Sequence, residues 1–278
     1  MSATLELAIG RTPRTAALFE AGRDYAIPTL PNITRAFAPM VREGRYEASE
    51  MAIATFLMAK AAGKPLVLLP AVLSARYQEG AMLCRADGPV RGPADLRGKR
   101  VGVRAYSQTT GMWLRGVLAE QHGVPPDAMR WVTFEDAHLA EYRDPPFAER
   151  APAGAAMLDM LLDGRLDAAI FGTELPDAPN LAPVFGDPEA AGAAFHAAYG
   201  FMPVNHLLVA RADVATARTT ELKALLERLR AGGCPVPGRA ELDPALLQAG
   251  RFCAEQGLIA RPLTAEEIWA GTPPALLG

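Results

Sequence analysis

The sequence is poor in cysteine and histidine. Its three cysteines, Cys84, Cys234 and Cys253, are far apart, odd in number and part of no CxxC or Cys/His spacing. No pair of His, Asp or Glu lies at metal-ligand spacing on one expected element. We therefore expect three buried free thiols in a reducing compartment, rather than a disulfide, and no bound metal.

A strong charge of either sign is also absent. Lysine and arginine total 28 against 31 aspartate and glutamate residues, which gives a formal net charge of −3. No basic run could follow a phosphate backbone, so we expect no nucleic-acid partner. Glycine-rich nucleotide fingerprints and Ser/His/Asp patterns are missing too, so the sequence offers neither a nucleotide-binding motif nor a serine nucleophile.

Long apolar runs are missing as well. No stretch approaches the roughly 18 apolar residues that a membrane span requires. Residues 1–10 lack the basic segment and the run of about 7–15 apolar residues that mark a secretory signal. These features predict no membrane partner and a cytoplasmic location.

What the sequence does contain is an alternation of strand and helix patterns, typical of an α/β protein whose parallel sheets are covered by helices. In such sheets ligands bind beyond the carboxyl ends of the strands. The segment 135–154 is rich in proline and charge and predicts a long surface loop, where function is often located. Strands are expected at residues 5–9, 66–73, 101–103, 166–171 and 205–210, and helices at 33–42, 55–62, 112–118, 157–162, 219–231, 243–256 and 264–270.

Two segments carry a resemblance at the level of the fold. Residues 93–103 (PADLRGKRVGV) look like the start of the second lobe in type 2 periplasmic binding proteins, and residues 160–169 (MLLDGRLDAA) are similar to a helix–strand unit of the same fold. The resemblance implies two α/β lobes, each with a mostly parallel sheet flanked by helices, and a ligand cleft between them. It also implies that lobe 1 is discontinuous, residues 1–91 plus 201–278, with lobe 2 at 92–200.

A narrower resemblance covers residues 5 to about 211. The blocks at 46–51 (YEASEM), 63–65 (GKP), 74–77 (SARY), 106–116 (YSQTTGMWLRG) and 199–206 (YGFMPVNH) resemble the 4,5-dihydroxyphthalate decarboxylase family. This resemblance implies a cytoplasmic enzyme that removes CO₂ from a hydroxylated aromatic or related cyclic carboxylic acid without an organic cofactor.

The sequence departs from the family at one place. Gln78-Glu79-Gly80 stand where family members carry an Arg-His-Ser-like run. A cationic, proton-donating patch is therefore missing, which leaves the substrate open between a phthalate and another cyclic acid.

A decarboxylase of this kind must deliver a proton to the carbon that loses CO₂. Of the four histidines, His206 alone lies in a family-like block, and imidazole changes its charge near neutral pH. We expect His206 to be the proton donor, with a structural histidine at a hinge as the alternative. Glu50, Ser49 and Tyr106 are expected to hydrogen-bond a substrate hydroxyl.

The substrate carboxylate needs a cationic or N–H-rich site. Thr109 and Thr110 stand where a strand turns into a helix and could bind an anion, or could simply cap the helix. Arg76 and Arg14 each follow a strand and could bind a carboxylate or form a surface ion pair. Glu174 follows another strand and is either a cleft residue or a solvated one.

Two other functions remain open from sequence. The same fold commonly hosts non-catalytic solute-binding proteins of the ABC-transporter type, and it could carry a lyase of another reaction type, for example a dehydratase. The expected partner in each case is a small-molecule carboxylate. The Ala- and Leu-rich C-terminal helices could also pack against a second copy of the chain.

Overall fold

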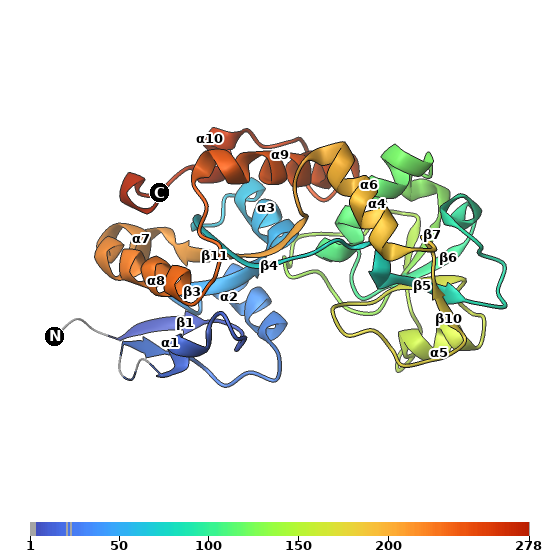
Figure 1. The fold of residues 1–278 in the computed structure, drawn as a ribbon, viewed down its shortest axis with the longest axis horizontal. Coiled ribbons are helices and arrows are strands. Elements are labelled where there is room, and N and C mark those ends of the chain that lie inside the picture. The colour runs from blue at the N-terminus through green and yellow to red at the C-terminus, as the bar shows by residue number, and fades with distance from the viewer. Residues whose placement is uncertain (1–3, 21, 23, 278) are drawn as a thin grey trace.

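The computed structural model describes residues 4–20, 22 and 24–277, and it has two lobes, each built on one β-sheet (Figure 1). The sheet of lobe 1 has the strand order β2-β1-β3-β11-β4, and the sheet of lobe 2 has the order β10-β5-β9-β6-β7-β8. Each lobe follows the expected pattern of a mostly parallel sheet covered by helices, which confirms the predicted fold class.

In lobe 1, β1 runs parallel to β2 and β3, whereas β11 is antiparallel to its neighbours β3 and β4. Its strands are β1 (Leu5–Ala8), β2 (Tyr25–Ala26), β3 (Ala48–Ala52), β4 (Leu66–Ala75) and β11 (Val204–Arg211). Its helices are α1 (Ala16–Glu20), α2 (Phe37–Glu43), α3 (Ile53–Ala61), α7 (Ala212–Ala217), α8 (Thr219–Ala231), α9 (Arg239–Glu255) and α10 (Ala265–Trp269).

In lobe 2, β6 is parallel to β7 and β9, and β7 is parallel to β8, whereas β5 runs antiparallel to β9 and β10. Its strands are β5 (Met82–Arg85), β6 (Arg100–Val103), β7 (Arg130–Thr133), β8 (Ala148–Arg150), β9 (Ala168–Ile170) and β10 (Leu181–Pro183). Its helices are α4 (Thr109–His122), α5 (Met157–Leu162) and α6 (Pro188–Tyr199). Strand β8 lies within the segment 135–154, so that segment is not loop throughout.

Strand β4 shows why lobe 1 has a core on both faces of its sheet. Successive side chains of a strand point to opposite faces, and here both sets are apolar. Val67 and Leu69 pack in a cluster with Leu225 of α8, whereas Leu66 and Leu68 belong to the cluster that contains α3 and α9. The apolar run at residues 66–73 therefore contributes side chains to two hydrophobic clusters, one on each face of the sheet.

The chain crosses between the lobes twice. The first crossing runs from the end of β4 to the start of β5, residues 76–81, and the return runs from α6 to β11, residues 200–203. The first boundary expected from sequence, residue 91, is too late, because β5 already pairs with β9 and β10 of lobe 2.

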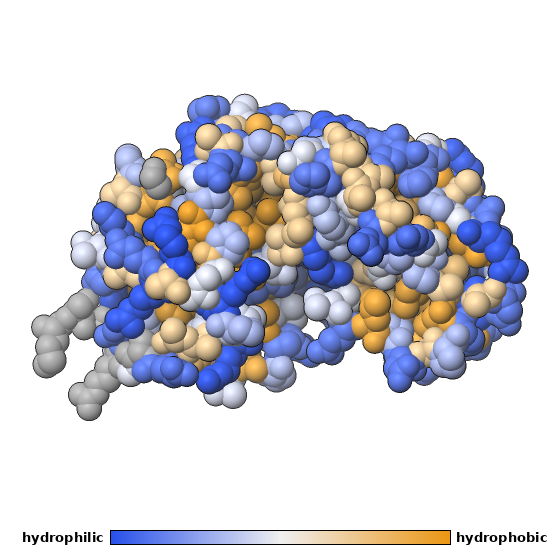
Figure 2. All heavy atoms as spheres, in the orientation of Figure 1, coloured by the Kyte–Doolittle hydropathy of each residue, from blue (hydrophilic) through white to orange (hydrophobic). Residues whose placement is uncertain are grey.

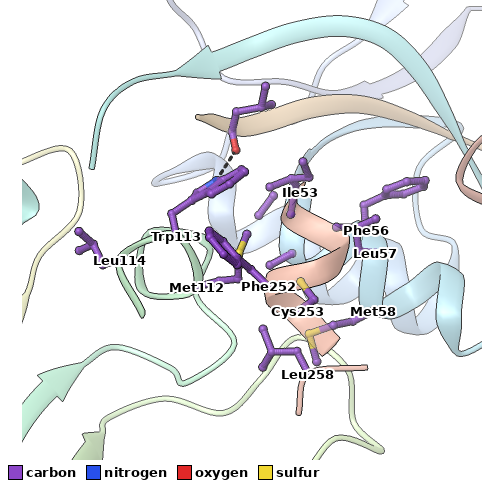
Figure 3. Packing of buried hydrophobic residues seen from close by; sticks show 14 of the residues in the cluster. Ile53, Phe56, Leu57, Met58, Met112, Trp113, Leu114, Phe252, Cys253 and Leu258 are labelled. Atoms are coloured by element: carbon purple, nitrogen blue, oxygen red, sulfur yellow. Dashed lines mark hydrogen bonds between the residues drawn. The ribbon is translucent and has the colours of Figure 1, made fainter. Parts of the chain in front are cut away.

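Helix α4 of lobe 2 packs directly against α9 of lobe 1. Trp113 is fully buried, its ring meets Phe252 edge-on at 5.8 Å between centroids, and its Nε1 donates to the Val204 carbonyl at 2.9 Å (Figure 3). The Gln256 amide accepts from Arg115 Nε at 2.7 Å and donates to the Met112 carbonyl at 2.8 Å. One hydrophobic cluster thus runs through both lobes and fixes their relative position.

Arg115 lies inside this interface. Its guanidinium is fully buried, 3.9 Å from the ring centroid of Tyr106 and 5.0 Å from that of Trp131. Burial lowers the pKa of Arg115. Its polar partners are the Gln256 side chain and the Tyr106 carbonyl rather than a carboxylate.

Gly116 permits the close approach of α4 and α9. A Cβ at this position would lie 2.2 Å from the Phe252 ring. We therefore expect Gly116→Ala to lower the free energy of unfolding by about 1–3 kcal/mol, the usual cost of overpacking. The matched control is Gly250→Ala on α9, where the nearest atom would lie 3.9 Å from the new Cβ. Urea denaturation should find this control unchanged or stabilised, and equal effects at both positions would contradict the packing argument.

Candidate functional site

A cavity of about 160 Å³ lies between the two lobes, where the surface of the molecule is hollowed (Figure 2). A cavity of roughly 150 Å³ holds one benzene molecule, so the enclosed space is that of a single ring. Lobe 1 contributes Thr34, Phe37, Ala52, Thr55, Ser74, Arg76, Asn205 and His206, and lobe 2 contributes Arg104, Ser107, Gln108, Thr109, Thr110, His138, Gly172 and Thr173.

The N-termini of two helices meet at this cavity. Helix α3 follows β3 and helix α4 follows β6, and the Ala54 backbone N–H of α3 donates to Thr109 Oγ1 of α4 at 3.2 Å. The residues before the two helices, Ala52 and Gln108, make no side-chain capping bond. First-turn N–H groups and the positive helix ends therefore give the cavity an affinity for anions.

Thr109 and Thr110 are the first two residues of α4, so neither occupies the N-cap position. Both are buried and both line the cavity. The alternative that they serve as plain N-caps is therefore wrong, because Gln108 holds that position.

His206 is held by a buried carboxylate. Its Nδ1 lies 2.6 Å from Glu50 Oε1, and the other Glu50 oxygen accepts the Gly10 backbone N–H at 3.0 Å. The Phe37 ring meets the imidazole edge-on at 5.2 Å between centroids. Since Glu50 occupies Nδ1, Nε2 is the nitrogen left for a molecule in the cavity. Glu50 itself lies behind His206 and outside the lining.

His138 is a second histidine of the lining, which sequence reasoning missed. Its Nδ1 lies 2.8 Å from Thr55 Oγ1, and its ring meets Phe37 edge-on at 5.5 Å. Burial, together with the positive charges of Arg104 and Arg42, lowers the pKa of His138 to about 4. The side chain is therefore a neutral imidazole at neutral pH. In the sequence, the one indication of a role for His138 is its position in the polar segment 135–154.

Two arginines reach the cavity, and they differ in their partners. Arg104 forms an ion pair with Glu135, Nη1 to Oε2 at 2.8 Å. Arg76 follows β4, and its buried Nε has no hydrogen-bond partner among the described residues. Burial lowers the pKa of Arg76. Arg76 is thus the arginine of the lining that can take a carboxylate without breaking an ion pair.

Besides Glu50, four predicted site residues lie outside the lining. Tyr106 is fully buried against Trp131, and its hydroxyl has no partner among the described residues. Ser49 is buried and donates to the Glu50 carbonyl at 2.7 Å. Arg14 lies exposed in the loop before α1, and Glu174 is exposed beside the lining residue Thr173.

The departure at residues 78–80 lies in the first crossing rather than in the cavity wall. Gln78 Nε2 donates to Asn205 Oδ1 and to the Arg76 carbonyl, both at 2.5 Å, and so joins the first crossing to the start of β11. Both carboxylate oxygens of Glu79 are buried without a hydrogen-bond partner among the described residues, and burial raises its pKa.

A larger hollow of about 570 Å³ lies beside the loop that carries His138. Three charged side chains on its wall, those of Arg42, Arg150 and Asp136, are already engaged. Arg42 donates to the Ala137 and His138 carbonyls, and Arg150 pairs with Asp136 at 3.0 Å. We therefore place the candidate site in the smaller cavity between the helix N-termini.

Within residues 4–20, 22 and 24–277, no group of three or more His, Cys, Asp or Glu side chains could hold a metal ion. The same residues include no helix long and apolar enough to cross a membrane. All three cysteines are free and buried, as the sequence predicted.

Comparison with known proteins supports both resemblances. The family model described as "NMT1/THI5 like" matches residues 34–155. The chain is 27% identical over 242 residues to the 4,5-dihydroxyphthalate decarboxylase of Comamonas testosteroni, covering 82% of this chain and 73% of that protein. It is 28% identical over 173 residues to the enzyme of the same name from Pseudomonas putida, covering 58% and 67%. The resemblance to this decarboxylase family is confirmed.

Solved structures support the fold alone. The periplasmic aliphatic sulphonate binding protein of Escherichia coli matches with a TM-score of 0.56 and 15% identity, over 99% of this chain and 85% of that one. The alkanesulfonate-binding protein of Xanthomonas axonopodis pv. citri matches with a TM-score of 0.51 and 16% identity, over 98% and 85%. Both are named as binding proteins.

The neutral state of His138 has a consequence for the pH dependence of stability. In the unfolded chain a histidine has a pKa near 6.5, whereas in the fold the pKa of His138 is lowered to about 4. Between these values the unfolded state binds more protons, so acidification through this range destabilises the fold. We expect His138 to remain predominantly a neutral imidazole, with one protonated ring nitrogen, in NMR titration from pH 8 to pH 5. A midpoint near 6.5 would contradict the buried environment described here.

Proposed function

We propose that this protein is a cytoplasmic, cofactor-independent carboxy-lyase that decarboxylates a hydroxylated aromatic or closely related cyclic acid. The observation that carries the proposal is His206, held by Glu50, in a ring-sized cavity where the N-termini of α3 and α4 and the Arg76 side chain also lie. The names of the two curated relatives support the reaction class. The buried free thiols suit a reducing compartment.

The carboxylate of the substrate would bind to Arg76 and to the first-turn N–H groups of α4. This arrangement directs the carbon that bears the carboxylate toward the remaining polar groups of the cavity. Charge-assisted hydrogen bonds in a site with little water are stronger than neutral ones. Orientation is therefore the first contribution of the chain to the reaction.

His206 then acts as the general acid. The protonated imidazole donates its Nε2 proton to the ring carbon that carries the carboxylate, and Glu50 supplies the counter-charge on Nδ1. The ring is cationic at this stage, and the oxygen of an ortho or para hydroxyl shares that charge. The bond to the carboxylate then breaks, its electron pair restores the aromatic ring, and CO₂ leaves.

The cations of the cavity favour a substrate with one carboxylate. Arg104 is already paired with Glu135, which leaves Arg76 as the unpaired arginine of the lining. The volume of about 160 Å³ also favours a single small ring. We therefore place hydroxybenzoates ahead of phthalates, which carry two carboxylates.

Solute binding without catalysis is the second candidate, and the fold of the sulfonate-binding relatives favours it. Turnover of a bound acid distinguishes the lyase from a solute-binding protein. Purified protein is incubated with a panel of hydroxybenzoates and phthalates, while CO₂ release and ring-proton exchange in deuterated water are measured. Release of CO₂ from at least one hydroxybenzoate supports the lyase. Micromolar binding of such an acid with no turnover supports the binding protein.

We expect His206→Asn to lower kcat by about 100-fold or more, since general acids contribute about 10²–10⁴-fold. Binding of the substrate, measured by calorimetry, should change only a few fold, because the carboxylate contacts remain. Retained turnover in this variant would rule out His206 as the proton donor.

Arg76→Met is expected to weaken binding of a benzoate by about 10–100-fold, which corresponds to the loss of a hydrogen bond between charged groups of about 1.5–3 kcal/mol. The matched control is Arg130→Met, because Arg130 is exposed at the start of β7 and outside the cavity. Calorimetric affinities that fall equally in both variants would contradict a carboxylate site at Arg76.

A further inference from the structure

The loop that carries His138 belongs to lobe 2 but is fastened to lobe 1. Arg42 of α2 donates from Nε to the His138 carbonyl at 2.7 Å and from Nη2 to the Ala137 carbonyl at 2.8 Å. Lys64 pairs with Glu141 at 2.7 Å. Since Thr55 of α3 also bonds the ring, the imidazole is fixed in the cavity at both its backbone and its side chain.

His138 and His206 both contact one aromatic ring. The Phe37 ring meets both imidazoles edge-on, at 5.5 Å and 5.2 Å between centroids. Each histidine uses Nδ1 for a protein partner, so each has Nε2 left for a molecule in the cavity. A single ring bound beside Phe37 would therefore meet two imidazole nitrogens.

The two imidazoles have opposite electrostatic surroundings. His206 has a carboxylate at 2.6 Å from Nδ1, whereas His138 has only a neutral hydroxyl there. The charged groups that act on His138 from the neighbouring elements are cationic: Arg104 after β6, Arg42 of α2, and His206 when protonated. Paired titratable groups whose surroundings differ in this way typically divide the roles of acid and base.

We propose that His138 is a second catalytic residue, the base that accepts the proton of the substrate's ring hydroxyl while His206 protonates the ring carbon. The assignment rests on the proposed decarboxylase function. It requires the tautomer in which Nδ1–H donates to Thr55 Oγ1 and the lone pair of Nε2 faces the substrate.

The proton count of this step balances. The Nε2 proton of His206 moves to the ring carbon, and the hydroxyl proton moves to Nε2 of His138. The hydroxyl oxygen becomes a ring carbonyl and neutralises the cationic ring. The bond to the carboxylate then breaks, its electrons restore the aromatic ring, and the oxygen takes its proton back from His138 as CO₂ leaves.

A weak base suits this role. A hydroxyl on a ring that has just been protonated is far more acidic than an ordinary phenol, so transfer occurs only when the carbon is protonated. Because burial and neighbouring cations disfavour the imidazolium of His138, the proton is returned readily once the ring is aromatic again. His138 therefore ends the cycle in its starting state.

The test compares a hydroxybenzoate that the protein decarboxylates with its methyl ether, which has no hydroxyl proton to lose. We expect His138→Gln to lower kcat on the hydroxy substrate by about 100-fold, with KM within a few fold. On the methyl ether the same variant should lose less than about threefold. Equal losses on both substrates would show a structural role and overturn the assignment.

Two further variants test the assignment while leaving His138 itself in place, so that misfolding of His138→Gln cannot account for the result. Thr55→Val removes the hydroxyl that orients the ring and should lower kcat on the hydroxy substrate, while Thr55→Ser should restore it. Full activity in Thr55→Val would contradict the required tautomer. The matched histidine control is His122→Gln, at the exposed end of α4 and outside the cavity, which should leave both substrates unaffected.

The outcomes separate this proposal from the one on which it rests. Turnover that is lost in His206→Asn but retained in His138→Gln overturns the base and leaves the decarboxylase. No turnover of any panel acid by the unaltered protein overturns the decarboxylase and the base with it.

Discussion

The contact between α4 and α9 is the constraint on which the rest of the structure depends. Trp113 and Phe252 meet inside a hydrophobic cluster that is shared by the two lobes, and Gln256 bonds to Met112 and Arg115 across the same interface. Because α4 is anchored there along its length, its N-terminus is held at a fixed place opposite lobe 1. The Ala54–Thr109 hydrogen bond then joins the starts of α3 and α4. The cavity lies beside these two helix N-termini, between the lobes that the α4–α9 contact holds together.

The electrostatic potential in the cavity is positive, because few carboxylates lie near the cationic groups that line it. Two helix N-termini and Arg76 face inward, and Glu50, which lies behind His206, is engaged by that histidine and by the Gly10 N–H. An anion that enters replaces no existing ion pair at Arg76. Such preorganisation is what lets a small site orient a carboxylate at little cost in rearrangement. The same arrangement explains why a binding protein and an enzyme could share the scaffold.

Much of the fold could be predicted from the sequence, because long apolar runs and glycines mark its elements. The run at 66–73 and the stop of α4 at Gly123, which has a φ of 64°, are local signals. Strands β5 and β10 have four and three residues, too few to reveal a period, and they were missed. The sequence alone therefore predicts the crossing near residue 91, later than its position between β4 and β5.

The site could be predicted in part. Arg76 and Thr109 follow strands, whereas His206 lies near the start of the antiparallel β11, and the topology of the two sheets brings these positions together. Ser49 and Glu50 are neighbours in β3 and face opposite sides, so only one could contribute to the site. His138 could not be found, because partners 83 and 96 residues away in sequence hold it in place.

The buried guanidinium of Arg115 has a consequence for how the protein responds to ionic strength. Its Nη1 lies within 3.0 Å of where a Cβ of Gly111 would be, so the charge is folded back onto the first turn of α4, beside the cavity. Mobile ions screen exposed charges but reach buried ones poorly. An attraction for carboxylates that originates partly from such a charge persists in concentrated salt, where a surface patch of arginines would lose its effect.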